Sequence, residues 1–423
     1  MTRYIVPAAI LATLAMVAVS TWRDAHAPHP AAGAARVPLV TATSREGLRA
    51  ATAALEARLA ARPDDAESAV RLADTLIRIQ RVEGDATAVV RAERVLEDVL
   101  ARVPGHYDVQ RMLGAVLLSQ HRFAEAIRVA QKARAIDPRD AWNYGVMGDA
   151  HLELGHYDEA FAAFDMMGRL RPGPGAYARV SYALELEGDL DGALTTMRMA
   201  AAATPAHDPE GQAWHFAQLG HLLLLEGRLG DAKLEFERAA YTFPGHPYAM
   251  KGLAQVAIAE GDLPAALATV RDLLARSPSP ELAAMAGDLE ARLGDAAAAE
   301  RHYDEAEQLE RQGWANEEPQ PQALARFLAE RDRDIAEAVR LAEDAASRRR
   351  DITTMDALAW SYFKAGRTDD AAVAAAAAVR TGTRDPRLLE HAATIFDAAG
   401  QPARARDLRS RMLTPCFDCR LSS

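Results

Sequence analysis

Apolar residues recur at i, i+3, i+4 and i+7 in short segments along most of this chain, and the segments come in pairs. The segments Tyr144–Leu154 and Asp158–Leu170 form a representative pair. This spacing places the apolar side chains on one face of an α-helix, so each segment predicts an amphipathic helix. A short polar turn separates the members of a pair, which predicts that the two helices run antiparallel. The pattern therefore indicates an all-α chain made of helix hairpins.

Three residue types keep one phase over several hundred residues, which indicates an internal repeat. An alanine recurs at intervals of 33, 34 or 39 residues, at Ala126, Ala160, Ala193, Ala232, Ala266, Ala299, Ala338, Ala371 and Ala405. Five positions before most of these alanines there is a glycine, at Gly155, Gly188, Gly227, Gly261, Gly294, Gly366 and Gly400. Prolines close the units at Pro104, Pro138, Pro172, Pro205, Pro244 and Pro278. The chain is therefore predicted to be an array of similar units.

Each repeat position has a physical explanation, which the unit around residues 141–174 illustrates. Gly155 follows the first helix, where the chain needs a left-handed residue that only glycine adopts without steric cost. Gly148 and Ala160 are small, which lets the two helices approach closely, and Phe164 fills the remaining space. Pro172 cannot continue the second helix. A single hairpin cannot bury its own apolar face, so neighbouring units are expected to stack.

At these positions the chain resembles the tetratricopeptide repeat (TPR) family, whose 34-residue unit carries small, Gly, Ala, aromatic and Pro residues at this spacing. The resemblance covers about residues 43–413 and implies an α-solenoid, a right-handed superhelix of stacked antiparallel hairpins. The aromatic position is filled by Ala130, Met197 or Val270 in some units, and residues 311–350 are degenerate. Segments near 80–88, 206–212 and 311–322 interrupt the repeat and are interpreted as loops.

The resemblance also implies where a partner would bind. Members of the family generally hold a peptide or partner helix on a concave wall built from the first helix of each unit. By phase, this wall is expected to carry Trp142, Asp149, Tyr182, Trp214, His221, Tyr248, Lys251, Trp360 and Phe363. Large aromatic side chains supply much of the binding energy in protein interfaces, so an aromatic groove is predicted. The alternative is that some of these rings pack against a neighbouring repeat.

Family members that grip a partner's C-terminal carboxylate use Lys, Arg and Asn on successive first helices. The matching positions here hold Arg111, Ala115, Gly145, Val146, Asp149 and Arg179. That clamp is therefore expected to be absent, and a receptor for chaperone tails is disfavoured.

The N-terminus carries the features of an export signal. Arg3 precedes an apolar run from Tyr4 to Val19, and Ala25-His26-Ala27 forms a small-x-small cleavage pattern. The run contains Pro7 and is shorter than the roughly 20 residues of a comfortable membrane span, which favours cleavage over a retained anchor. The predicted organisation is a signal peptide (1–27), a Pro/Ala-rich linker (28–43), the repeat domain (44–413) and a tail (414–423). A periplasmic or secreted location follows, with anchoring through an uncleaved segment as the alternative.

Composition narrows the possible chemistry. The formal net charge of −11 provides no basic field for phosphates or anionic lipids, so nucleic acid is an unexpected partner, and a membrane contact is expected only through the N-terminal segment. The sequence contains no H-E-x-x-H, G-x-S-x-G or Walker-type motif. No catalytic residue, metal site or cofactor is therefore predicted, and the chain is not expected to be an enzyme.

The two cysteines, Cys416 and Cys419, form a C-x-x-C pair after the last repeat. In an oxidising compartment the simplest outcomes are a small disulfide or an unbridged dithiol in the tail. A redox or metal role is the alternative, although the βαβ setting that usually activates such a pair is missing.

Two functional hypotheses follow. The favoured one is a non-enzymatic exported scaffold that binds a protein or peptide segment on its concave face, within a cell-envelope assembly. The alternative is a thiol or metal delivery protein, or a redox accessory protein, that uses Cys416 and Cys419.

Overall fold

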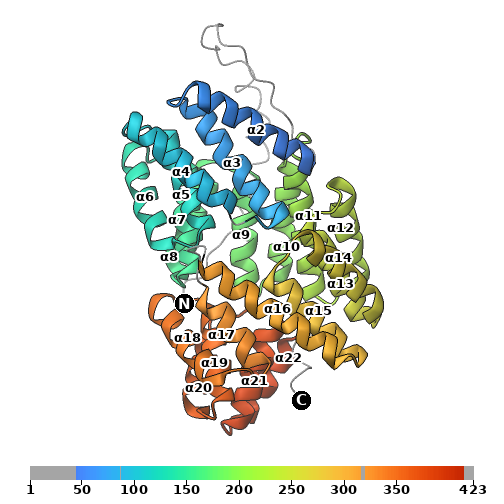
Figure 1. The fold of residues 1–423 in the computed structure, drawn as a ribbon. Coiled ribbons are helices and arrows are strands. Elements are labelled where there is room, and N and C mark those ends of the chain that lie inside the picture. The colour runs from blue at the N-terminus through green and yellow to red at the C-terminus, as the bar shows by residue number, and fades with distance from the viewer. Residues whose placement is uncertain (1–43, 86, 316–319, 414–423) are drawn as a thin grey trace. The chain divides into compact units, whose positions relative to one another are not determined.

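The computed structural model of the chain is an array of α-helices (Figure 1). It describes residues 44–85, 87–315 and 320–413. Within these ranges there are 21 helices, labelled α2 to α22, and no strand. The predicted all-α class is confirmed.

The helices alternate between first and second members of hairpins, after a single opening helix, α2 (Arg45–Ala61). The first helices are α3 (Ala66–Glu83), α5 (Tyr107–Ser119), α7 (Ala141–Glu153), α9 (Pro174–Leu186), α11 (Pro209–Leu225), α13 (Pro247–Glu260), α15 (Pro280–Leu293), α17 (Pro321–Glu330), α19 (Ile352–Lys364) and α21 (Pro386–Ala398). The second helices are α4 (Thr87–Arg102), α6 (Phe123–Ile136), α8 (Tyr157–Leu170), α10 (Leu190–Ala203), α12 (Leu229–Thr242), α14 (Leu263–Arg276), α16 (Ala296–Ala315), α18 (Ile335–Arg348), α20 (Thr368–Ala378) and α22 (Pro402–Arg411).

Packing follows the order of the chain. Each first helix packs against the second helix of its own unit, and most second helices also pack against the first helix that follows. First helices of neighbouring units contact one another as well, for example α5 with α7 and α19 with α21. Units that bury their apolar faces mainly against neighbours form a solenoid, so the predicted α-solenoid is confirmed.

The repeat positions have the roles that the sequence predicts. The repeat alanines, from Ala126 to Ala405, are at most 3% exposed. The seven phased glycines all have positive φ, between 73° at Gly400 and 90° at Gly294. Small buried residues and left-handed helix ends therefore recur once per unit.

The aromatic position is filled by a ring that lies against a glycine of the facing helix. A Cβ atom at Gly148 would lie 2.6 Å from Cδ1 of Phe164, whose side chain is 2% exposed. Phe236 occupies the same position in a later unit, between Gly220 of its own unit and Gly252 of the next. A methyl group at any of these three glycines would overlap the ring. The ring and the glycine therefore fix how closely the helices approach.

Three segments interpreted as loops differ from the prediction. Helix α16 continues to Ala315, so the first part of segment 311–322 is helical, and α3 continues through Glu83. Helix α11 begins at Pro209, inside segment 206–212. Arg311 and Gln312 are good helix formers, and Arg311 pairs with Glu307 four residues earlier, which supports the helix at this point. The degenerate stretch 311–350 still contains the hairpin of α17 and α18.

The array returns on itself, because units that are far apart in sequence meet at two seams. At the first seam, α2 and α3 lie against the region of α11 and α13. Arg45 donates from Nη2 to the Gly245 carbonyl oxygen (3.0 Å), and Arg78 pairs with Asp208 (2.7 Å). At the second seam, the turn between α7 and α8 meets the turn between α18 and α19, where Ile352 and Leu388 join a buried cluster with Leu152 and Phe164.

Several predicted segments lie outside the described residues. These are the signal peptide (1–27), the linker (28–43) and the tail with Cys416 and Cys419 (414–423). Among the helices that the structure does describe, none combines the length and the apolar character needed to span a bilayer.

The first prediction concerns the contact between glycine and ring. Gly148→Ala should destabilise the fold by about 1–3 kcal/mol, because the added methyl group overlaps Phe164. Gly168→Ala is a matched control inside α8, where a Cβ has no atom within 4 Å, and it should stabilise by about 0.5–1 kcal/mol through helix propensity. Chemical denaturation measures both values. Equal effects of the two substitutions would contradict the role assigned to Gly148.

The first seam contains a buried carboxylate. Glu210 on α11 is fully buried and pairs with Arg81 of α3. The His246 ring is also fully buried, with Nε2 3.8 Å from Oε1 of Glu210. Burial alone would raise the pKa of Glu210, but the His246 ring and the guanidinium groups of Arg81 and Arg78 lower it to about 2. The ionised carboxylate is therefore the stable form at the seam.

The second prediction follows from this lowered pKa. A carboxyl group with a pKa of about 2 in the folded chain, against 4.5 as its ordinary value, stabilises the fold above pH 4.5, and this stabilisation is lost as the pH falls toward 2. Glu210→Gln should lower the free energy of unfolding by on the order of 3 kcal/mol at neutral pH. Between pH 4.5 and pH 2, the slope of the free energy of unfolding against pH should also decrease by the equivalent of one proton. Glu56→Gln removes an exposed partner of Arg91 and should change little. Equal slopes for wild type and Glu210→Gln would refute the assignment.

Candidate functional site

The first helices carry a row of polar side chains that join one unit to the next. Arg179 on α9 donates to both carboxylate oxygens of Asp149 on α7 (2.8 and 2.5 Å). His221 on α11 lies 3.3 Å from Glu185 on α9, and Lys251 on α13 lies 3.0 Å from Glu281 on α15. We call this row, together with Glu153, Tyr182, Tyr248 and Arg387, the inner face.

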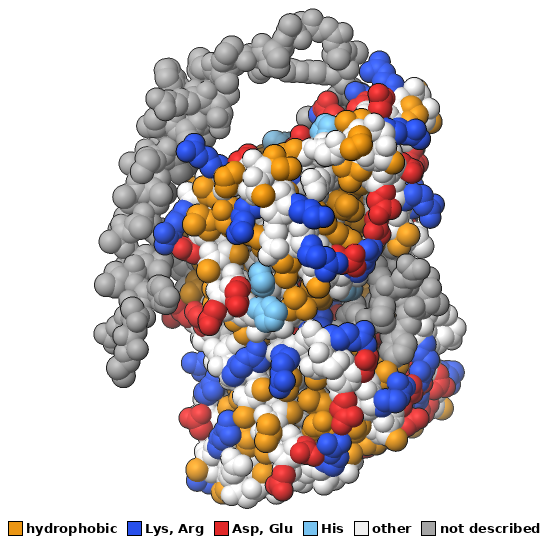
Figure 2. All heavy atoms as spheres, turned by 90° about the vertical axis from the view of Figure 1, so that its left-hand side faces the viewer, with side chains coloured by type: hydrophobic (Ala, Val, Ile, Leu, Met, Phe, Trp, Pro, Cys, Tyr) orange, Lys and Arg blue, Asp and Glu red, His pale blue; other side chains and the backbone are white. Residues whose placement is uncertain are grey.

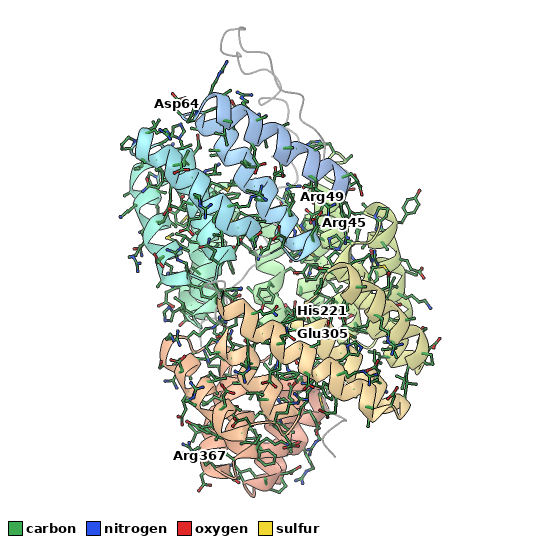
Figure 3. All side chains as sticks on the ribbon, viewed as in Figure 1. Arg45, Arg49, Asp64, His221, Glu305 and Arg367 are labelled. Atoms are coloured by element: carbon green, nitrogen blue, oxygen red, sulfur yellow. The ribbon has the colours of Figure 1, made fainter. Side chains whose placement is uncertain are left out.

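Charges on distant units also act on the inner face. The carboxylate of Asp385, at the start of α21, acts on His221, and the guanidinium group of Arg387 acts on Glu281. Burial would lower the pKa of His221, but the charge and hydrogen bond of Glu185 raise it above its ordinary value. The packing agrees for α9, because Leu388 of α21 lies in one buried cluster with Leu186 of α9. Figure 3 labels His221 near the centre of the view.

Tyr182 is one aromatic residue that this arrangement leaves open to water. Its side chain is 42% exposed, although it lies on a first helix among other units. Loss of solvation raises the pKa of its hydroxyl well above the ordinary value, and the carboxylates of Glu185 and Glu153 raise it further. The ring is thus reachable by solvent but surrounded by protein and by negative charge. Such a ring can stack on a partner side chain at low cost in conformational entropy.

Five of the nine predicted contact residues carry a polar group and are at least partly accessible to solvent. They are Asp149, Tyr182, His221, Tyr248 and Lys251. Tyr248 is 40% exposed and has the Lys251 ammonium group 5.8 Å from its ring centre. The structure places Asp149, Tyr182, His221 and Lys251 on successive first helices, as the repeat phase predicts.

The other four predicted residues pack largely into the protein. Trp142 and Trp214 are partly buried against one apolar cluster, and Phe363 against another. Trp142 donates from Nε1 to the Arg111 carbonyl oxygen (3.3 Å). Each of these three rings therefore fills space between neighbouring units while part of its surface stays accessible, and the aromatic groove stays a prediction.

Trp360 requires a correction. Its side chain is 5% exposed, and its ring stacks on His391 of the next unit with centroids 4.0 Å apart. The expectation that Trp360 is accessible to a partner is wrong, because the following first helix covers it. The alternative stated for such rings, packing against a neighbouring repeat, holds here.

Sequence reasoning missed the carboxylates that complete the inner face. Glu185 lies one helical turn after Tyr182, and Glu281 lies in the first turn of α15. The sequence does not distinguish these two residues from other acids, because acidic residues on helices are usually solvated surface groups. Their spacing from the predicted residues, three positions within α9 and one unit along the array, is the signal that could have identified them.

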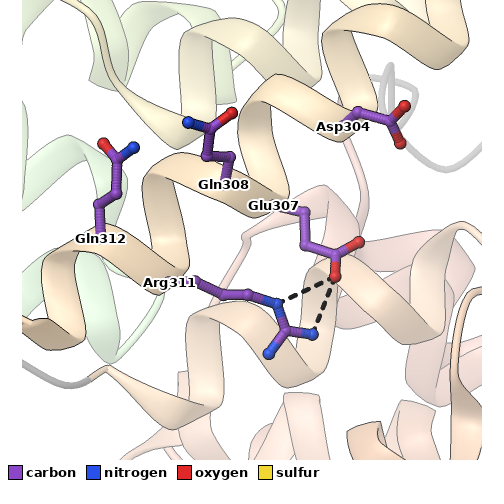
Figure 4. Close-up of a pocket in the computed structure, with 5 residues that line it drawn as sticks. All are labelled: Asp304, Glu307, Gln308, Arg311 and Gln312. Atoms are coloured by element: carbon purple, nitrogen blue, oxygen red, sulfur yellow. Dashed lines mark hydrogen bonds and ion pairs between the residues drawn. The ribbon is translucent and has the colours of Figure 1, made fainter.

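A shallow polar depression lies along α16 (Figure 4). It is lined by Asp304, Glu307, Gln308, Arg311 and Gln312, which share one face of the helix. Arg311 pairs with Glu307 and also with Glu337 of α18 (2.7 Å). The depression is open and its charges are already paired, so it has the features of an ordinary solvated helix face.

The face of the described chain that Figure 2 shows has no patch of a single charge. Figure 2 shows Lys and Arg interspersed with Asp and Glu over the face in view, with hydrophobic side chains between them. Within the described ranges, no group of three or more His, Cys, Asp or Glu side chains is arranged to hold a metal ion. Cys416 and Cys419 lie beyond the last described residue.

Comparison with known families and proteins agrees with the repeat. Models of the tetratricopeptide repeat match residues 89–141, 117–180 and 223–289. A segment of 122 residues is 31% identical to the Hsp70-Hsp90 organizing protein of Triticum aestivum. The match covers 29% of this chain and spans 19% of that protein's length.

One solved structure supports the same kind of fold. Human IFIT1, in a dimer with m7Gppp-AAAA, superposes with a TM-score of 0.50 at 15% identity, over 80% of this chain and 77% of that chain. Yeast Tom70 is also similar, with a TM-score of 0.44 at 15% identity over 88% of this chain and 86% of its own. At such low identity the likeness concerns the fold alone.

The third prediction separates buried rings from accessible rings. Trp360→Ala should destabilise the fold by about 3–5 kcal/mol, because it leaves a cavity beside His391 and Phe363. Tyr248→Ala removes a ring that is 40% exposed and should cost less than about 1 kcal/mol. Urea denaturation followed by circular dichroism gives both values. If Trp360→Ala proves as stable as Tyr248→Ala, the packing described here is incorrect.

Proposed function

Because the chain is a tetratricopeptide repeat protein, a scaffold for protein interactions, we propose that its inner face binds an extended segment of a protein partner. Scaffolds of this family are generally non-enzymatic. The proposed site runs along the first helices from α7 to α15.

One observation carries this proposal: Tyr182 stays 42% exposed in the middle of an otherwise paired row of charges. Polar pairs on both sides of it, Arg179–Asp149 and His221–Glu185, offer hydrogen-bonding groups at intervals of one unit. An extended peptide needs main-chain hydrogen-bond partners along its length and a few side-chain anchors. The polar pairs of the inner face would supply the hydrogen-bond partners, and Tyr182 and Tyr248 would supply the anchors.

The matched Hsp70-Hsp90 organizing protein raises the question of chaperone tails as partners. At the positions where a carboxylate clamp would lie, Arg111 pairs with Asp140 (3.1 Å) and Arg179 pairs with Asp149. Both guanidinium groups are thus neutralised by this chain's own carboxylates. We therefore propose a partner that presents an internal segment and not a free C-terminal carboxylate.

We also propose that the protein acts outside the cytoplasm, within an envelope assembly. The support is the apolar run Tyr4–Val19 after Arg3, followed by Ala25-His26-Ala27. The mass of the N-terminal peptide of protein purified from an envelope fraction tests this. A peptide that begins after Ala27 is expected, and one that begins at Met1 would favour the anchored alternative.

The fourth prediction tests the binding site. Tyr182→Ala and Tyr248→Ala should each weaken capture of the partner by about tenfold or more, because a buried aromatic anchor typically contributes more than 1 kcal/mol. The partner is captured from an envelope fraction, identified by crosslinking and mass spectrometry, and then titrated as a purified protein. Affinities are compared by calorimetry.

The matched control is Tyr241→Ala. Tyr241 lies on the second helix α12 and is 89% exposed, so its loss removes an equal ring from outside the inner face. Its affinity should stay at the wild-type value. Weakening by Tyr241→Ala but not by Tyr182→Ala would move the site to the second helices and reject the proposal.

A further inference from the structure

The turn between α7 and α8 brings two histidine rings together. Nδ1 of His151 and Nδ1 of His156 lie 3.4 Å apart, and the ring centroids are 5.6 Å apart with the ring planes inclined by 49°. His156 is exposed and His151 is half-buried. The two nitrogen atoms therefore converge at the surface of the described chain.

The backbone of the turn fixes this arrangement. The His156 amide donates to the His151 carbonyl oxygen (2.8 Å), and the Gly155 amide donates to the Leu152 carbonyl oxygen (2.9 Å). With Gly155 in the left-handed region at φ +80°, these two hydrogen bonds form a Schellman motif. The motif commonly brings the side chains of its first and last residues into contact, and here these residues are His151 and His156.

Contacts with distant units hold the same turn from outside. The Arg350 amide donates to the Leu154 carbonyl oxygen (3.1 Å), and Arg380 donates from Nη2 to the Gly155 carbonyl oxygen (3.0 Å). The main chains touch at Gly155, where a Cβ would lie 2.5 Å from the Arg350 carbonyl carbon. Two side chains that are positioned before they bind a ligand lose little conformational freedom on binding it.

The repeat does not require histidines at these two positions. The same hydrogen bond closes the first helix of other units, where it joins Leu184 to Asp189 and Leu223 to Arg228. Among the described units that share the bond, no other has a histidine at either position. Hairpin packing therefore leaves the histidine pair unexplained.

The separation of the two nitrogen atoms matches that of two ligands of a tetrahedral metal ion. Zn²⁺ binds histidine nitrogen at about 2.0–2.1 Å and prefers tetrahedral geometry, so two such ligands lie about 3.3–3.4 Å apart. The observed 3.4 Å is also longer than the roughly 2.9–3.0 Å typical of N–H···O hydrogen bonds in proteins. The exposed carboxylates of Asp158 and Glu159, in the first turn of α8, add negative charge that favours a cation.

We propose that His151 and His156 bind a divalent transition metal ion through their Nδ1 atoms, and that Zn²⁺ is the ion that fits. No group of three or more possible metal ligands surrounds such an ion in the described ranges, so water completes its coordination. The bound ion ties the end of α7 to the start of α8. Zinc motifs in sequences do not include this pair, because its ligands lie five residues apart and meet only through the turn. The site is independent of the inner face and of any partner.

The test titrates zinc chloride into the full chain after treatment with a chelator. To leave only the histidines of the described chain as strong ligands, the protein carries Cys416→Ser, Cys419→Ser, His26→Asn and His29→Asn. Calorimetry should give one site with a Kd of about 1–100 µM, since two protein ligands supply part of the affinity of a four-ligand site. His156→Asn should weaken binding at least about tenfold, and asparagine suits this N-cap position of α8.

The matched control is His207→Asn, which removes an exposed histidine from the turn before α11. It should leave the affinity for zinc within about twofold of the parent value. Equal affinity of His156→Asn and His207→Asn overturns the inference. Absence of binding tighter than about 1 mM in the parent chain also overturns it.

A second measurement needs no substitution at the site. In two-bond ¹H–¹⁵N spectra of the histidine side chains, one equivalent of zinc should shift the Nδ1 signals of His151 and His156 and leave those of His207 in place. A shift in only one of the two rings, or at Nε2 in place of Nδ1, overturns the two-nitrogen site. Because no protein partner is used, failure of the proposed partner binding leaves this result interpretable.

Discussion

The fit of an aromatic ring against a glycine on the facing helix is the contact on which the rest of this structure depends. Phe164 against Gly148, Phe236 between Gly220 and Gly252, and Tyr303 against Gly287 leave no room for a methyl group. The Phe236 ring touches glycines of two consecutive units, so it fixes both the hairpin and its angle to the next unit. Repeated along the chain, such angles wind the array until distant units meet at the two seams.

The winding of the array changes the surroundings of the side chains on the first helices. In an open superhelix their side chains would face free solvent. Here Leu388 of α21 is buried in one cluster with Leu186 of α9, so first helices from both parts of the array meet. A charge in such surroundings is costly unless it is paired, which explains the chain of ion pairs from Asp149 to Glu281. Tyr182 can remain at the boundary between protein and water because its apolar ring packs against protein while its hydroxyl group is solvated.

The sequence predicted the local structure well and the long-range structure poorly. Ala160, Gly155 and Phe164 occupy the predicted positions because the repeat encodes contacts within a unit and between neighbours. Trp360 was misplaced because its cover, His391, belongs to the next unit, where no periodic signal marks it. The contact between Gly155 and Arg350 was unpredictable, since Gly155 serves the same helix-ending role as Gly366 and only the winding gives it a second neighbour. The inner-face carboxylates were similarly hidden among ordinary surface acids.

The central claim is that the repeat closes on itself, and a distance across the second seam tests it most directly. Spin labels attached through Asp158→Cys on α8 and Ser347→Cys on α18, in the chain with Cys416→Ser and Cys419→Ser, report that distance by double electron–electron resonance. Both positions are exposed and lie close in sequence to Tyr157 and Arg349, which make contacts across the second seam. The closed array predicts one narrow distribution at short distance. A broad distribution centred at long distance would show an open superhelix and contradict the account.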